Sequence, residues 1–143
     1  MNYQEFLGKV QRLGGFPGGE EARATVANVL MAVAEVLPQD QLNALALKLP
    51  PELLVYLRRT RPEPDPYFDS QLFLGWVVSG LDATGARDKS DGGLDLYATY
   101  SGDEAIRRCQ CVFVVLKSLL EPGENRAMAG GLPDGVDAWF LQA

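Results

Sequence analysis

The sequence predicts an all-α protein built from two stacked, pseudo-symmetric helical repeats, with about eight helices and one irregular insertion in the second repeat. Three observations predict this fold. Apolar residues recur at helical spacing along most of the chain. Proline and glycine interrupt that spacing at intervals that suit short helices. Finally, residues from Glu21 to Phe140 contain one pattern twice, and a single offset of 83 aligns the two copies.

The repeat is visible in pairs of matched residues. The offset of 83 places Glu21 on Glu104, Val29 on Val112, Leu37 on Leu120, Ala44 on Ala127, Leu49-Pro50 on Leu132-Pro133, and Tyr56-Leu57 on Trp139-Phe140. Such self-similarity is typical of a helical unit that cannot bury its apolar face alone and stacks on a copy of itself. We therefore expect one domain, with the first repeat in residues 1–60, a proline-rich connector in residues 61–67 and the second repeat in residues 68–143.

The two longer helices of the first repeat come first along the chain. One is predicted from about Tyr3 to Leu13, because Asn2 followed by Glu5 is a capping signal. The glycines from Gly14 to Gly19 end it. The next is predicted from Glu20 to Leu37, with acidic residues in its first turn, where they complement the helix dipole. It is apolar on most sides, so we expect it to be central and largely buried.

Two short helices complete the first repeat. Pro38 opens one that reaches about Lys48, since proline is tolerated in the first turn. Leu49-Pro50-Pro51 ends it and starts a fourth helix, which continues to Leu57. The arginines from Arg58 to Arg61 are favoured by the dipole at a helix C-terminus, and binding of an acidic partner is the alternative. Alternating prolines in the residues that follow predict an extended connector.

The second repeat follows the same plan. Phe73-Leu74 restates Phe6-Leu7 at an offset of 67. Ser101 and Glu104 have the spacing of a capping box, and the counterpart of the central helix is predicted from Ala105 to Leu120. Pro122 and Pro133 flank the last two short helices. Because the offsets of 67 and 83 differ by 16, the second repeat holds an insertion of 16 residues within residues 82–100.

The order of these motifs resembles a known family. Tyr3 and Phe6-Leu7 come first, followed by Glu20-Glu21-Ala22, Val29-Leu30, Leu37-Pro38 and Leu49-Pro50-Pro51-Glu52-Leu53. This order is similar to that of the bacterial domain of unknown function family 2267, and the resemblance covers nearly the whole chain. It implies a small all-helical fold, commonly with two copies of the unit. It implies no catalytic residues, since the shared motifs pack and cap helices.

Length and charge limit the function. The chain has 143 residues, a net charge of −6 and no histidine. The acidic balance disfavours nucleic acid and anionic membrane surfaces as partners. No signal peptide or membrane-spanning segment is indicated, so we expect a cytoplasmic protein. Without histidine, the commonest general base and a usual zinc ligand are missing, and no catalytic, cofactor-binding or metal-binding residue is predicted.

Other chemical motifs have simpler interpretations. Cys109 and Cys111 are one residue apart, and buried apolar side chains are favoured over a redox pair. The carboxylates between Asp88 and Asp95 lack the spacing of an EF-hand loop, so a solvated turn is favoured over a calcium site. The glycine pairs lack the remainder of a phosphate loop. Trp76 and Trp139 fall at apolar helical positions and are expected in the core or between the repeats.

The candidate partner-binding residues lie in and beside the insertion. Its leucines alternate with polar residues like a short strand, and its tyrosines are of a type enriched at interfaces. The insertion therefore either covers the helices or presents tyrosines to a partner. Two further arginines near a helix N-terminus oppose the dipole, which either Glu104 or a partner offsets. The candidates are Arg87, Asp88, Lys89, Leu94, Leu96, Tyr97, Tyr100, Arg107 and Arg108.

These observations predict a non-catalytic module for protein interaction or self-association, with another protein or a second copy as its partner and no cofactor. The alternative is a binder of a small apolar molecule in the groove between the repeats, where helical bundles often place ligand sites. An enzyme ranks third, because no pair of carboxylates stands out in an apolar context.

Overall fold

The computed structural model describes residues 1–59, 61–83 and 102–143, and these residues form eight helices and no strand. The predicted all-α class is therefore confirmed for the described part of the chain. The helices are α1 (Tyr3–Gly14), α2 (Gly19–Val36), α3 (Gln39–Ala46), the 3-10 helix η1 (Pro51–Tyr56), α4 (Ser70–Ala83), α6 (Gly102–Leu119), α7 (Pro122–Gly131) and α8 (Val136–Gln142).

The first helix begins and ends for the reasons that the sequence indicates. The side chain of Asn2 accepts a hydrogen bond from the Glu5 backbone N–H at 2.8 Å, which satisfies one of the free donors of the first turn. At the other end Gly15 adopts a left-handed conformation, with φ of 63°. The backbone N–H groups of Gly15 and Phe16 donate to the carbonyls of Arg12 and Gln11, which is a Schellman motif.

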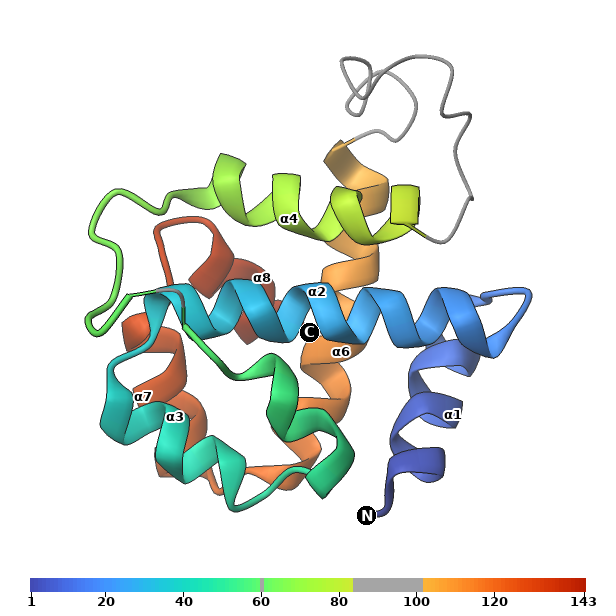
Figure 1. Cartoon of the computed structure of the whole chain (residues 1–143), viewed down its shortest axis with the longest axis horizontal. Coiled ribbons are helices and arrows are strands. Elements are labelled where there is room, and N and C mark those ends of the chain that lie inside the picture. Colours follow the sequence, from blue (N-terminus) through green and yellow to red (C-terminus); the bar gives the residue numbers. More distant parts are fainter. Residues whose placement is uncertain (60, 84–101) are drawn as a thin grey trace.

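The long helices are arranged around α2, which crosses the middle of the molecule (Figure 1). Helix α4 packs along one side of α2, and α6 crosses behind it. Helix α1 packs against both α2 and α6, while α8 packs against α6. The short helices α3 and α7 lie at the same end of the molecule in Figure 1. Segments far apart in the sequence therefore share one core.

That core is continuous and rich in phenylalanine. Phe6, Phe73, Phe113 and Phe140 are all fully buried. The rings of Phe113 and Phe140 meet edge to face with centroids 5.2 Å apart, a favourable geometry for aromatic pairs. The predicted packing of Trp76 and Trp139 is confirmed, since both are partly buried against this core.

The segment after α3 differs from the prediction in two ways. The fourth helix is a 3-10 helix rather than an α-helix, and a short run of this kind suits a segment that opens with Pro50-Pro51. The Arg59 guanidinium donates to the carbonyl oxygen of Leu37 and, at 3.4 Å, to that of Ala34. It therefore satisfies the C-terminus of α2, not that of its own helix.

The predicted connector is attached to α2, since the Asp65 backbone N–H donates to the Glu35 carbonyl at 2.9 Å. Residue Ser101 of the predicted capping box lies outside the described residues, as does nearly all of the insertion. Among the described helices, none is long and apolar enough to cross a membrane.

Candidate functional site

Most of the predicted partner-binding residues fall in the insertion. Seven of the nine lie outside the described residues, and they are Arg87, Asp88, Lys89, Leu94, Leu96, Tyr97 and Tyr100. Whether this segment covers the helices or binds a partner stays a prediction. The other two residues, Arg107 and Arg108, lie in the first half of α6.

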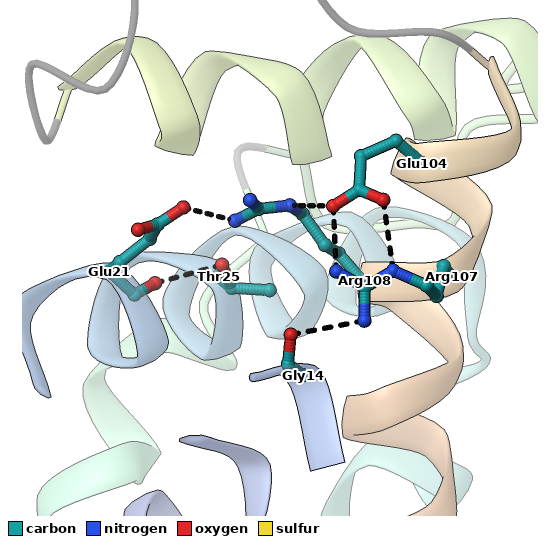
Figure 2. Close-up of polar contacts among 6 residues, drawn as sticks. All are labelled: Gly14, Glu21, Thr25, Glu104, Arg107 and Arg108. Atoms are coloured by element: carbon teal, nitrogen blue, oxygen red, sulfur yellow. Dashed lines mark hydrogen bonds and ion pairs between the residues drawn. The ribbon is translucent and has the colours of Figure 1, made fainter. Parts of the chain in front are cut away.

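Arg108 connects the N-terminal halves of the two longest helices (Figure 2). Its Nη1 lies 2.5 Å from Oε1 of Glu21 on α2, and its Nε lies 2.8 Å from Oε1 of Glu104 on α6. The guanidinium also lies over the Phe16 ring, 4.6 Å from the centroid, where a cation–π interaction is favourable. The side chain is 11% exposed, so Arg108 is an interior link between helices and offers little cationic surface.

Arg107 lies beside it and is more accessible, with 45% of its side chain exposed. Its Nε and Nη2 form a two-point contact with the Glu104 carboxylate at 2.9 and 2.7 Å. Its Nη1 donates to the Gly14 carbonyl at 3.0 Å, at the end of α1 (Figure 2). Both arginines are therefore engaged within the chain.

Glu104 offsets the positive charge near the start of α6. Hydrogen bonds from the two arginines, that from Arg107 first, lower its pKa to about 2, although burial acts in the opposite direction. The sequence interpretation in which Glu104 offsets the unfavourable position of these arginines agrees with this geometry. The contacts of Arg107 and Arg108 reach α1, α2 and α6, so this cluster holds the three helices together.

A separate, apolar pocket lies between α3 and α7. Its volume is about 80 Å³. It is lined by Leu37, Gln41, Ala44, Leu45, Leu120, Glu124, Ala127 and Met128. Six of these eight residues are apolar, and they include one alanine from each helix, Ala44 and Ala127. The walls of this pocket suit a small apolar group.

The two polar residues of this pocket differ in their partners. Glu124 Oε1 accepts a hydrogen bond from the Glu121 backbone N–H at 2.8 Å and lies 3.6 Å from Lys48 Nζ. Gln41 Oε1 is buried and has no hydrogen-bond partner among the described residues. The pocket therefore combines apolar walls, one compensated charge and one unsatisfied acceptor.

The remaining chemically reactive residues are buried. Cys109 is fully buried and Cys111 is 6% exposed, and neither forms a disulfide. Burial raises the pKa of both thiols, which keeps them in the unreactive protonated form. The interpretation of both cysteines as apolar core residues is confirmed. The described residues contain no group of three acidic or cysteine side chains close enough to hold a metal ion.

The sequence predicted a groove between the repeats but named none of its residues. The signal was present in the alignment of Ala44 with Ala127, which places small residues at matched positions of two short helices. What spacing alone does not give is that α3 and α7 line the same pocket.

A family model described as "Uncharacterized conserved protein (DUF2267)" matches residues 3–139. No curated protein matches the chain.

Proposed function

The chain belongs to the DUF2267 family of conserved proteins, and from that premise we propose that it is a non-catalytic binding module which holds a small apolar group in the pocket between α3 and α7. The observation that carries the proposal is the composition of that pocket. Its walls are apolar, its volume is small, and its residues come from both predicted repeats. A helical scaffold with a defined apolar cavity is suited to binding rather than to acid–base chemistry.

The proposal includes the two-copy organisation of the fold. In its support, α2 and α6 are both 18 residues long and their bounds are related by the offset of 83. Helices α1 and α4 begin at positions related by the offset of 67. Matched core positions are fully buried in both copies, in the pairs Phe6 and Phe73, Val10 and Val77, Ala22 and Ala105, Val29 and Val112, and Leu53 and Val136.

The packing between the copies also supports this organisation. Helix α4 of the second copy packs on α2 of the first, and α1 of the first copy packs on α6 of the second. Each copy thus covers the long helix of the other. A unit with an apolar face on both sides of its long helix needs such a partner to be stable.

The pocket fits this symmetry residue by residue. The eight lining residues form four matched pairs at the offset of 83, namely Leu37 with Leu120, Gln41 with Glu124, Ala44 with Ala127, and Leu45 with Met128. We place the binding site on the axis that relates the copies, where each contributes the same positions.

The size of the pocket limits its ligand. An engineered cavity of about 150 Å³ accepts benzene, and one water has a share of liquid volume of about 30 Å³. A pocket of about 80 Å³ is therefore suited to an aliphatic group of three or four carbon atoms. Longer ligands would extend from the pocket into solvent.

Native mass spectrometry of freshly purified protein tests this function. We expect a retained ligand to appear as extra mass in the wild type. The Ala127→Leu variant fills the pocket from α7 and should lose that mass. The Ala24→Leu variant, which adds the same group to α2 away from the pocket, should keep it. Equal retention by both variants would exclude the pocket as the site. A wild type with no extra mass, whose pocket methyl groups also do not respond to a short branched alcohol, would exclude the function.

Protein interaction or self-association is the second candidate. It is supported by a groove between α1 and α6 lined by Leu13, Val114 and their neighbours, because both of these apolar side chains are exposed. This groove lies between the first copy and the second. The proposed partner is a second copy of the chain.

Light scattering distinguishes this second candidate. If the groove joins two copies, the wild type should be dimeric. The double variant Leu13→Asp/Val114→Asp should be monomeric. Leu47→Asp changes an exposed leucine at the end of α3 and is the control. Replacement of residues 82–100 by a short glycine-serine loop tests the insertion in the same assay. A monomeric wild type would contradict self-association.

A further inference from the structure

We infer that the ligand of the α3/α7 pocket is a neutral molecule that joins a short apolar group to one hydrogen-bond donor, and that Gln41 Oε1 accepts that donor. The inference rests on the proposed function, because it names the chemistry of the group which that pocket binds. It assigns Gln41 as the polar anchor of the site.

The first step is the state of the Gln41 oxygen. It is buried and lacks a hydrogen-bond partner among the described residues, although the residue lines the pocket. Buried acceptors without a donor are rare in folded proteins, since each loses its hydration without compensation. An oxygen of this kind at the wall of a pocket is suited to a donor that the ligand brings.

The second step compares Gln41 with Glu124, its match at the offset of 83. Glu124 Oε1 has two sources of compensation, the backbone N–H of Glu121 at 2.8 Å and Nζ of Lys48 at 3.6 Å. The residues that match Glu121 and Lys48 in the other copy are Pro38 and Gly131. Proline has no N–H to donate, and glycine has no side chain.

Two sequence differences therefore explain why Gln41 Oε1 is unsatisfied. They remove both donors on one side of the pocket, while the other side keeps both. The walls of the pocket are matched, but its hydrogen-bonding capacity is not. This asymmetry gives the pocket a polar end at Gln41 and a direction for the ligand.

Gly131 also brings the end of α7 onto the start of α3. A Cβ atom at this position would lie 2.7 Å from Leu37 Cδ2 and 2.8 Å from Gln41 Oε1. No donor of the chain can be added there without displacing these atoms. Gln41 Oε1 has essentially no exposed surface in the free protein, so the donor of a ligand reaches it from the pocket only when the Gln41 side chain turns.

The charge of the ligand follows from the rest of the lining. The one carboxylate, Glu124, already lies beside Lys48. A charged ligand would lose its hydration among alanine, leucine and methionine without gaining a counter-ion. A neutral donor such as a hydroxyl group avoids this cost and satisfies Gln41.

Methyl-detected NMR titration tests the inference directly, since six of the lining residues carry methyl groups. The probes are 2-methyl-1-propanol and 1-chloro-2-methylpropane, which differ by the exchange of a hydroxyl for chlorine. We expect both to shift the methyl signals of Ala44, Ala127 and Met128. The alcohol should bind about two- to tenfold more tightly, as one added hydrogen bond implies.

Two variants change the acceptor in different ways. Gln41→Leu removes the oxygen and keeps the apolar wall. Pro38→Ala leaves the lining intact and provides a backbone N–H in the position that Glu121 has relative to Glu124. In each variant the affinity for 2-methyl-1-propanol should fall to that for 1-chloro-2-methylpropane, while the affinity for 1-chloro-2-methylpropane should stay unchanged. Gln11→Leu, on α1 and outside the pocket, is the matched control and should retain the preference.

The outcomes separate this inference from the proposed function. If the wild type binds both probes equally, or keeps its preference in both variants, the role of Gln41 is wrong and the pocket remains a binding site. If neither probe shifts the pocket methyl groups of the wild type, the proposed function fails as well.

Discussion

At the scale of single residues, Arg108 has the most consequential position. The offset of 83 in the sequence aligns Arg108 with Thr25, whose hydroxyl donates to the Glu21 carbonyl within its own helix at 2.8 Å. Arg108 instead reaches two carboxylates at matched positions, Glu21 and Glu104, on different helices. One side chain thus compensates the acidic first turns of both long helices and joins them.

We expect Arg108→Met to destabilise the fold by about 2–4 kcal/mol, because it leaves the largely buried Glu21 carboxylate without its cation, whereas Glu104 keeps its contact with Arg107. Arg107→Met should cost at most about 1 kcal/mol, since that side chain is largely exposed and its pair is screened by solvent. Urea denaturation of the two variants beside the wild type measures both effects. Equal losses would show that the buried link to Glu21 contributes nothing.

The second prediction at this scale concerns acid. Glu104 has a pKa of about 2 in the folded protein, below its ordinary value of 4.5. The stability that its ionised form contributes is therefore complete above about pH 4.5 and is lost as the pH falls from 4.5 to 2. We expect this contribution to be about 1–2 kcal/mol, allowing for the screening of a partly exposed carboxylate.

Denaturant unfolding from pH 6 to pH 2 checks that prediction. Glu104→Gln should be less stable than the wild type at pH 6 and should approach it as the pH reaches 2. The control, Glu5→Gln, removes an exposed carboxylate of α1. A difference in the free energy of unfolding between the wild type and Glu104→Gln that is the same at every pH would contradict the prediction. It would mean that the arginine contacts do not lower the pKa of Glu104.

At the scale of the element, the turn after α1 connects local structure to the Arg108 contacts. Gly14 lies so close to Phe16 that a Cβ atom would meet the ring at 2.5 Å. Gly15 provides the left-handed conformation that ends the helix. Together they place the Phe16 ring beneath the Arg108 guanidinium.

Substitutions at these two glycines should therefore have different effects. Gly15→Ala should cost about 1 kcal/mol, the strain of alanine in the left-handed region. Gly14→Ala should cost more, about 2–3 kcal/mol, because it displaces a buried ring. In the Arg108→Met background, the cost of Gly14→Ala should shrink, which a double-mutant cycle measures. Strict additivity would mean that the turn and Arg108 act independently.

The helix bounds show how much of the fold the sequence predicts. Helix starts and stops followed from caps, glycines and prolines, so α1 and α2 agree with their predicted bounds within a residue or two. The 3-10 helix was missed, because periodicity does not separate six residues of 3-10 helix from an α-helical turn. The sequence predicts that Arg59 compensates the C-terminus of its own helix, whereas its guanidinium donates to carbonyls at the end of α2. Which helix end it reaches depends on how the chain folds back.

At the scale of the whole molecule, the same limit applies to the candidate site. The sequence indicated a groove between two copies, because matched apolar stripes must meet somewhere. It did not indicate that Ala44 and Ala127 line one pocket, or that Gln41 Oε1 is left without a donor. Those facts depend on the packing of α3 against α7, which spacing along the chain does not encode. The insertion of residues 82–100 remains a separate prediction.

The most direct test of the central claim is a crystal structure determined under xenon pressure, because xenon binds in small apolar cavities. The claim is that the pocket between α3 and α7 is built to hold a small apolar group. We expect a strong xenon peak among Leu37, Leu45, Leu120 and Met128, and its loss in Ala127→Leu. A crystal with no peak at this position, or with the same peak in Ala127→Leu, would contradict the claim.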